Sequence, residues 1–297
     1  MAGLYFHIPF CKRICAYCDF YKSARLEQMD GVTAAMHREL DERQDYLRGE
    51  AVTTRYFGGG TPSLYAPAAL KGLLDHAALL FDCSGTTETT LEANPDDLTE
   101  NYLDGLREAG IDRLSIGIQS FDDGCLKLMN RRGTGAEIRA LFDTLRRRIP
   151  GLVLRTSIIA GLPGEGEAEF EELCDFLREE KIERAGVFPF SPEEGTKAAT
   201  MEHVPMEEAQ RRTELLVDVQ SDIIDEYNES VLGDVREVLC EGWSEEAQSF
   251  VGRSYAESVD IDGKIYFTSY REIMAGEFVN VRLTGTMDGE LTGELAE

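Results

Sequence analysis

The feature that most constrains the fold is an alternation of two kinds of segment over the first 190 residues. Short apolar, β-branched or aromatic runs, typical of buried strands, alternate with amphipathic stretches that have helical spacing. The candidate strands are Leu4–His7, Thr53–Phe57, Thr87–Glu92, Arg113–Ile118, Leu152–Ala160 and Ala185–Phe190. The candidate helices lie near residues 25–48, 67–81, 99–109, 135–148 and 167–180, and Thr99 has the character of an N-cap. This alternation predicts an α/β fold, a partial (β/α)6 barrel with a parallel sheet and outer helices.

The pattern changes after Phe190. Residues 205–230 are rich in Glu, Gln and Leu and predict one long helix. From Val235 to Leu295, short alternating segments separated by glycine predict a small all-β unit, a five-stranded OB-like barrel. We therefore predict a core over residues 1–204, a connecting helix over 205–232 and a β-barrel over 233–297.

The chain is strongly acidic, with 56 acidic and 30 basic residues and a formal charge of −26. This charge opposes nonspecific binding to nucleic acid or anionic lipid and favours a basic macromolecular partner, although a solvated acidic surface explains it equally well. No apolar run approaches the roughly 20 residues of a membrane span. The segment Leu4–Ile8 is typical of a strand and not of a signal peptide. We therefore expect a cytoplasmic protein with no membrane partner.

Seven cysteines are present, and an odd number in a cytosolic chain argues against a disulfide framework. Three of them, Cys11, Cys15 and Cys18, follow the first candidate strand directly with the spacing C-x3-C-x2-C. The other four lie far apart in the sequence and are expected to be buried apolar thiols. They are Cys83, Cys125, Cys174 and Cys240.

The three-cysteine spacing predicts a [4Fe–4S] cluster, because three thiolates bind three irons and leave the fourth without a protein ligand. An open iron can chelate the amino and carboxylate groups of S-adenosylmethionine (SAM). Electron transfer into the sulfonium then yields a 5′-deoxyadenosyl radical, chemistry that the cofactor supplies. A structural zinc site would need a fourth ligand. His7 is a candidate for that ligand, but it lies in the strand ahead of the loop.

Further motifs stand at the ends of the next candidate strands, where a parallel sheet places its reactive groups. The first is a glycine run, Gly58, Gly59 and Gly60 with Thr61, whose backbone can approach a ligand closely and hold the SAM amino group. A tight turn after a strand is its alternative explanation.

Polar residues end the third and fourth candidate strands. Glu92 and Gln119 are placed to hydrogen-bond ribose hydroxyls and to position the methionine, unless they serve as caps and loop residues. Arg131 is a candidate partner of the SAM carboxylate or, because Arg132 is adjacent, a surface arginine. Gly161 follows the fifth strand and is expected against the adenine. No catalytic residue is assigned beyond the cluster ligands.

Residues 1–128 resemble the family of oxygen-independent coproporphyrinogen oxidases and haem chaperones. The motifs that carry this resemblance are Tyr5-x-His7-Ile8-Pro9-Phe10-Cys11, Phe57-Gly58-Gly59-Gly60-Thr61-Pro62-Ser63, Glu92-x-Asn94-Pro95 and Arg113-Leu114-Ser115-x-Gly117-x-Gln119-Ser120-Phe121. Cys18-Asp19-Phe20 lacks the further cysteine of the true oxidases, so this part is similar to the haem-chaperone branch. Tyr5, in the first of these motifs, and Tyr17, between Cys15 and Cys18, join the expected cofactor-binding residues.

Residues 126–297 resemble instead the radical SAM methylthiotransferases that modify an aspartate of a small-subunit ribosomal protein. The motifs include Lys127-Leu128-Met129-Asn130-Arg131-Arg132-Gly133, Leu154-Arg155-Thr156-x-Ile158-Ile159, Ser191-x-Glu193-Glu194-Gly195-Thr196, Val251-Gly252-Arg253-Ser254 and Ile261-Asp262-Gly263. This resemblance implies that the C-terminal barrel is a TRAM domain. Ser157 stands where the porphyrin branch carries a ribose-binding aspartate, so Glu92 would bind more of the ribose.

The two resemblances leave several functions open. The first is a methylthiotransferase-like radical SAM enzyme that docks a basic protein, such as a ribosomal protein, through a barrel with 14 acidic and 5 basic residues over 233–297. RNA is less favoured as its partner, and an electron donor such as flavodoxin or ferredoxin is implied. Without the second three-cysteine cluster of that family, we expect one cluster and inefficient sulfur insertion.

The alternatives are a coproporphyrinogen oxidase-like protein, a haem chaperone with His7 as a candidate axial ligand, and a chimeric chain that folds without efficient turnover. The haem motif of the first family is not found in this sequence. A Soret band that depends on His7 would support the haem-binding alternative.

Overall fold

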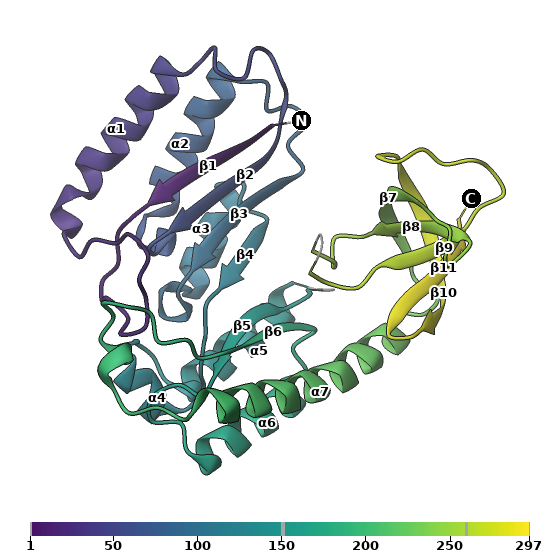
Figure 1. Ribbon diagram of the computed structural model, residues 1–297. Helices are drawn as coiled ribbons and strands as arrows, with labels where there is room; N and C mark the ends of the chain where they lie inside the picture. Colours follow the sequence, from purple (N-terminus) through teal and green to yellow (C-terminus); the bar gives the residue numbers. More distant parts are fainter. Residues whose placement is uncertain (1, 150–151, 259–260, 297) are drawn as a thin grey trace. The chain divides into compact units, whose positions relative to one another are not determined.

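The computed structural model describes residues 2–149, 152–258 and 261–296 (Figure 1). Four parallel strands form one sheet in the order β1-β2-β3-β4. They are β1 (Ala2–Ile8), β2 (Val52–Gly59), β3 (Glu88–Ala93) and β4 (Arg113–Ile116). The helices between them are α1 (Met29–Glu42), α2 (Pro67–Leu80) and α3 (Glu100–Glu108). Strands in sequence order joined by helices confirm the predicted parallel α/β architecture.

The two faces of this sheet differ in character. Phe57 and Leu91 are fully buried on one face, where the helices cover the sheet (Figure 1). The register places Tyr5 beside Tyr56 and His7 beside Gly58 on the opposite face. The side chain of Tyr5 is 58% exposed there. One face of the sheet is therefore core, and the other is an open polar surface.

The remaining strands of the α/β part follow in sequence order. The chain beyond β4 makes a single parallel bridge, Gln119 with Ile158 in β5 (Arg155–Ala160), and β5 pairs with β6 (Arg184–Pro189). The associated helices are α4 (Asp123–Leu128), α5 (Gly135–Arg148) and α6 (Glu167–Glu180).

Some element bounds differ from prediction for identifiable reasons. The fourth strand ends at Ile116 and not at Ile118, because Gln119 has φ +70° and the chain turns away from strand geometry there. The fifth strand begins at Arg155, three residues later than predicted. Helix α4 was not predicted, since six residues carry too little periodicity. The predicted N-cap at Thr99 is confirmed, as its hydroxyl accepts from the Tyr102 N–H at 3.3 Å.

Beyond β6, helix α7 (Met206–Ser230) leads to a closed barrel of five strands in the order β10-β11-β9-β8-β7. The strands are β7 (Val235–Ser244), β8 (Ser249–Arg253), β9 (Ile265–Thr268), β10 (Phe278–Met287) and β11 (Glu290–Leu295). Val238, Ile265, Phe267 and Val281 fill the barrel interior. The predicted five-stranded barrel is therefore confirmed.

The chain divides into two compact units. One comprises residues 1–150, 156–176 and 186–213, and the other comprises 151–155, 177–185 and 214–297. Two short segments of the predicted core thus group with the barrel, and the division at 204/205 and 232/233 remains a proposal. In the described ranges, no helix combines the length and apolar character that a membrane crossing requires.

All seven cysteines lie in the described part of the chain and are free thiols. Cys125, Cys174 and Cys240 are buried, as expected. Cys83 is only half-buried, because it lies in the loop between α2 and β3.

Candidate cluster and cofactor site

The three clustered cysteines lie in the loop that follows β1. Backbone hydrogen bonds fix this loop: Cys11 N–H donates to the Ser23 carbonyl at 3.0 Å, and Cys18 N–H donates to the Cys15 carbonyl at 3.3 Å. Between them, Ala16 N–H donates to the Met129 carbonyl at 2.9 Å. The loop is therefore held to the segment after α4 and does not hang free.

Each of the three thiols is half-buried, and two have polar neighbours. The Thr61 hydroxyl donates to Cys11 Sγ at 3.4 Å, and Arg131 Nη1 lies 3.8 Å from Cys15 Sγ. Burial raises the pKa of the Cys11 thiol, and the Thr61 hydrogen bond opposes that rise. Among the described residues, no three His, Cys, Asp or Glu side chains converge on a point for a single metal ion. A cubane does not need such convergence, because each thiolate binds a different iron.

Arg131 joins the cysteine loop to the ends of two strands. Its guanidinium donates to the Tyr17 hydroxyl at 3.2 Å and to Asn94 Oδ1 at 3.1 Å, and it also donates to the Gly117 carbonyl. These partners belong to the cysteine loop, the end of β3 and the end of β4. The interpretation of Arg131 as a surface arginine is therefore wrong.

The glycine run at the end of β2 lies against the start of the cysteine loop. Gly59 has φ +115°, which disfavours any side chain. At Gly60 an added Cβ would lie 2.7 Å from the Phe10 carbonyl oxygen, so backbone occupies the space. Thr61 N–H donates to the same Phe10 carbonyl at 2.8 Å. Glycine is thus required where the strand end meets the segment that enters the cysteine loop.

Glu92 connects β3 to this glycine run. Its Oε2 accepts from the Gly59 N–H at 3.0 Å, and its Oε1 accepts from the Tyr56 hydroxyl at 2.8 Å. Tyr5 stacks on Tyr56 with ring centroids 5.9 Å apart, and its hydroxyl lies 3.1 Å from His7 Nδ1. Burial and then the hydrogen bond to Glu92 raise the pKa of Tyr56, so its proton stays available to the carboxylate.

Gln119 and Gly161 lie just beyond the C-terminal ends of β4 and β5. The backbone of Gln119 bonds to the two residues that flank Ile158 in β5: its N–H donates to the Ser157 carbonyl, and its carbonyl accepts from the Ile159 N–H. Its side-chain Oε1 is buried and has no hydrogen-bond partner within the described structure. Buried polar atoms are normally paired, so this oxygen indicates room for a donor from a ligand. Gly161 has φ +82° and its N–H donates to Glu165 Oε1 at 2.7 Å.

The ion-pair partner of Glu165 was not predicted from the sequence. Arg212 on α7 donates to Glu165 Oε1 at 2.9 Å and to the Gly166 carbonyl at 3.0 Å. Both side chains of this ion pair are nearly fully buried, at 5% and 3% exposure. The two residues are 47 positions apart, which conceals the pairing in the sequence. Only the short spacing between Gly161 and Glu165 indicates that this loop is held by a side chain.

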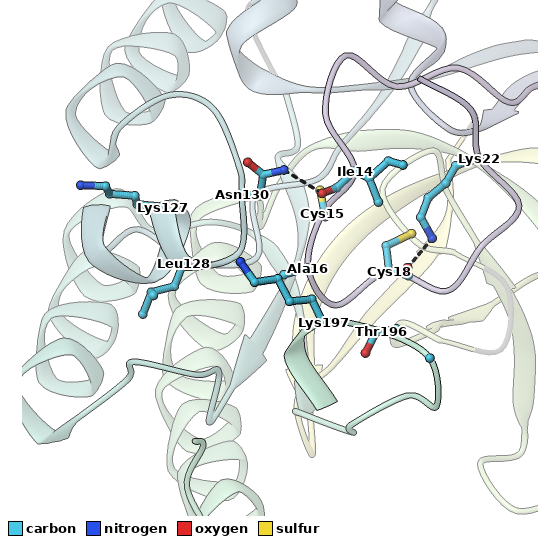
Figure 2. A pocket seen from close by; sticks show the side chains of 11 residues that line it. Ile14, Cys15, Ala16, Cys18, Lys22, Lys127, Leu128, Asn130, Thr196 and Lys197 are labelled. Atoms are coloured by element: carbon cyan, nitrogen blue, oxygen red, sulfur yellow. Dashed lines mark hydrogen bonds between the residues drawn. The ribbon is translucent and has the colours of Figure 1, made fainter. Parts of the chain in front are cut away.

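A cavity of about 550 Å³ lies beside the cysteine loop (Figure 2). Cys15 and Cys18 line it, together with residues of α4 and of the loop after β6. Three lysines, Lys22, Lys127 and Lys197, also line it. The sequence offered no signal for this cluster, because the lysines are far apart along the chain.

Two family models match the chain. The model of the Radical SAM superfamily matches residues 5–177, and the model of the TRAM domain matches residues 232–296. The chain belongs to the radical SAM superfamily. The expected TRAM domain coincides with the five-stranded barrel.

Among curated relatives of this radical SAM protein are methylthiotransferases. The ribosomal protein uS12 methylthiotransferase RimO of Acetivibrio thermocellus is 41% identical over 298 residues, which cover 96% of this chain and 63% of the relative. RimO of Geotalea uraniireducens is 38% identical over 96% of this chain and 64% of its own length. The chain therefore spans a little under two thirds of these relatives. A likeness that covers 96% of this chain includes most of the N-terminal 128 residues, which also resemble the porphyrin branch.

A solved structure agrees with the fold. Coproporphyrinogen III oxidase from Escherichia coli, described as a radical SAM enzyme, superposes with a TM-score of 0.61 at 25% identity over 77% of this chain and 52% of that chain. Both resemblances found in the sequence thus have counterparts among known proteins.

The residues of this radical SAM protein fit the cofactors that its superfamily implies. Three thiols on one short loop are the donor set of a site-differentiated cluster. The buried Gln119 Oε1, which has no hydrogen-bond partner among the described residues, is an acceptor that a ligand hydroxyl would satisfy.

Proposed function

We propose that this radical SAM protein binds one [4Fe–4S] cluster through Cys11, Cys15 and Cys18 and acts as a methylthiotransferase on a small-subunit ribosomal protein. When bound, the reduced cluster supplies the electron that cleaves SAM to methionine and a 5′-deoxyadenosyl radical. The observation that carries the proposal is the position of Arg131, which bonds at once to the cysteine loop and to the ends of β3 and β4.

The chain's own residues divide the work of holding SAM. Arg131 supplies positive charge beside Cys15, where the carboxylate of the methionine moiety would be neutralised. Glu92 fixes the glycine run through the Gly59 N–H, which leaves the run's remaining backbone groups for the amino group. The free Oε1 of Gln119 accepts from a ribose hydroxyl, and the Gly161 turn offers backbone to the adenine.

The substrate class rests on relatives and on charge. The similar RimO proteins are named for modification of ribosomal protein uS12, and the likeness covers 96% of this chain. The barrel segment 233–297 carries 14 acidic and 5 basic residues, which suits a basic protein better than RNA. A ribosomal protein and a flavodoxin- or ferredoxin-type donor would both meet this enzyme in the cytoplasm.

Anaerobic reconstitution tests the proposal. We expect about four irons and four sulfides per chain, and release of 5′-deoxyadenosine from SAM with dithionite. Alanine at Cys11, Cys15 and Cys18 should abolish both, whereas Cys83→Ala, a half-buried cysteine away from the loop, should retain both. Mass spectrometry of uS12 incubated with the loaded enzyme then tests for a methylthio group. Iron content unchanged in the triple variant would contradict the cluster assignment.

A further inference from the structure

The cavity beside the cysteine loop is cationic in a chain that is otherwise acidic. Three of the chain's seven lysines line it, and none of its eleven described lining residues is acidic, although acidic residues outnumber basic ones 56 to 30 overall. The lysines come from three segments: Lys22 from the cysteine loop, Lys127 from α4 and Lys197 from the loop after β6 (Figure 2). The fold therefore gathers positive charge that the sequence disperses.

These lysines are not neutralised locally. In the described part of the chain, no carboxylate lies within ion-pair distance of Lys22, Lys127 or Lys197. By contrast, Lys12 and Lys71 pair with Asp97 and Asp75. Lys127 and Lys197 are exposed, whereas Lys22 donates to the Cys18 and Phe20 carbonyls and supports the loop. Uncompensated charge at a surface is available to a partner of opposite sign.

Apolar surface accompanies the charge. Ile14 and Leu128 line the same cavity and are 44% and 42% exposed. Phe20 and Tyr21 follow Cys18 in the loop and are 72% and 79% exposed. Small electron-transfer interfaces combine such a patch with a ring of charge, because the complex must form quickly and dissociate again.

We infer that the surface formed by Ile14, Lys22, Lys127, Leu128 and Lys197, here called the lysine patch, docks a small acidic protein that delivers one electron to the cluster site. Cys15 and Cys18 line the same cavity, so a carrier seated there lies next to two cluster ligands. The carrier is oxidised by one electron and the cluster site is reduced by one, with no bond or proton transferred. The role of the carrier as an electron donor rests on the proposed function. The lysine patch itself is observed in the structure and does not depend on that function.

Local charge decides the docking place despite the net charge of −26. At physiological ionic strength, exposed charges more than about 8 Å apart are largely screened from one another. An acidic carrier is therefore repelled only weakly by carboxylates beyond that range, and the lysine patch attracts it although the exposed Asp19, Glu193 and Glu194 lie in the same two loops. RNA phosphates would also be attracted by lysines, but the exposed apolar residues and the adjoining cysteines favour a redox protein.

The test compares two double variants with equal change in charge. K127E/K197E reverses the exposed part of the lysine patch and leaves Lys22 to support the loop. K71E/K264E reverses two exposed lysines elsewhere, on α2 and just before β9. Binding of oxidised flavodoxin is measured at low and high salt, and carbodiimide crosslinks between its carboxylates and lysines of this chain are located by mass spectrometry.

We expect K127E/K197E to weaken flavodoxin binding by at least about tenfold at low salt and K71E/K264E to change it by less than about twofold. Crosslinks should fall on Lys127 and Lys197. With reduced flavodoxin as donor, 5′-deoxyadenosine release should fall in K127E/K197E, whereas with dithionite it should stay within about twofold of wild type.

Equal binding by wild type and K127E/K197E, or crosslinks mainly at Lys71 and Lys264, would overturn the inference. Binding of a labelled oligoribonucleotide is measured alongside, and its loss in K127E/K197E with carrier binding intact would also overturn the inference. Loss of activity that is equal with both reductants would also overturn it, because the lysines would then act on the cluster site. A wild-type protein without iron or dithionite-driven cleavage would defeat the proposed function, and the binding and crosslinking measurements would still decide the docking surface.

Discussion

Arg131 Nη1 lies 3.8 Å from the Sγ of Cys15, although 115 residues separate the two in the sequence. The same guanidinium bonds to Tyr17, Asn94 and the Gly117 carbonyl. A rigid planar donor with several N–H groups can serve all these acceptors at once, which an ammonium cannot. This one side chain therefore ties the cysteine loop to the ends of both β3 and β4.

Replacing Arg131 should therefore impair the site more than the fold. We expect Arg131→Gln to lower iron retention or 5′-deoxyadenosine release by about 10- to 100-fold, as is typical when a partner of a metal ligand is removed. Arg131→Lys should recover little of this loss. Arg38→Gln, on an exposed position of α1, is the control. Activity and iron content like wild type in Arg131→Gln would show that the arginine is not needed to hold the loop.

Gly60 lies where the glycine run at the end of β2 contacts the segment that enters the cysteine loop. A Cβ there would lie 2.7 Å from the Phe10 carbonyl oxygen, so Gly60→Ala must displace backbone next to Cys11. We expect a loss of about 1–3 kcal/mol in the free energy of unfolding, together with poor iron retention.

Gly72→Ala is the matched control for that substitution. It lies in α2 with nothing within 4 Å of the added Cβ, and alanine is the better helix former. We expect it to stabilise the protein by up to about 1 kcal/mol. Chemical denaturation of both variants gives the comparison, and equal stabilities would show that the Gly60 contact relaxes without cost.

The sequence predicted those parts of the fold and site that local patterns determine. Buried β-branched runs located all six strands of the α/β part, and the spacing of Cys11, Cys15 and Cys18 marked the loop on its own. Alternation with glycine was enough to predict the five-stranded barrel.

The features that sequence reasoning missed depend on contacts between distant segments. Lys22, Lys127 and Lys197 share a cavity only because two loops and helix α4 meet there. Arg212 reaches Glu165 only because α7 passes beside that turn. The positive φ of Gln119 ends β4 early, and no local propensity marks a glutamine for that conformation.

Glu92 offers a direct test of SAM binding. Glu92→Ala removes the acceptor of the Gly59 N–H and of the Tyr56 hydroxyl, so the glycine run loses its support from β3. We expect the dissociation constant for SAM to rise about tenfold, the equivalent of about 1.4 kcal/mol. Equilibrium dialysis against the reconstituted protein measures it.

Glu88→Ala is the control for Glu92→Ala. Glu88 is the first residue of β3, at the end of the strand away from Glu92, and it pairs with Arg113. Its removal should leave SAM affinity within about twofold of wild type, since exposed pairs contribute about 0–1 kcal/mol. If both variants bound SAM equally, the position of Glu92 at the strand end would not matter for the cofactor.

The carboxyl of Asp96 should make stability depend on pH. It lies beside Asp97 and bonds to Arg132, yet its Oδ1 is buried without a hydrogen-bond partner in the described structure. Burial and then the charge of Asp97 raise the pKa of Asp96 above its ordinary value, against the opposing effect of Arg132. The folded state therefore binds this proton more tightly than the unfolded state.

Linkage gives the sign of that dependence. Below the unfolded-state pKa of about 3.9, Asp96 is protonated in both states and does not lower the free energy of unfolding. As the pH rises through the raised folded-state pKa, the buried carboxyl must ionise and stability is lost. We therefore expect Asp96→Asn to gain stability relative to wild type as the pH rises from about 4 to about 7. Asp45→Asn, at an exposed position, should show no such trend in urea denaturation. A difference between Asp96→Asn and wild type that stays constant with pH would mean that Asp96 ionises in the fold as it does in the unfolded chain.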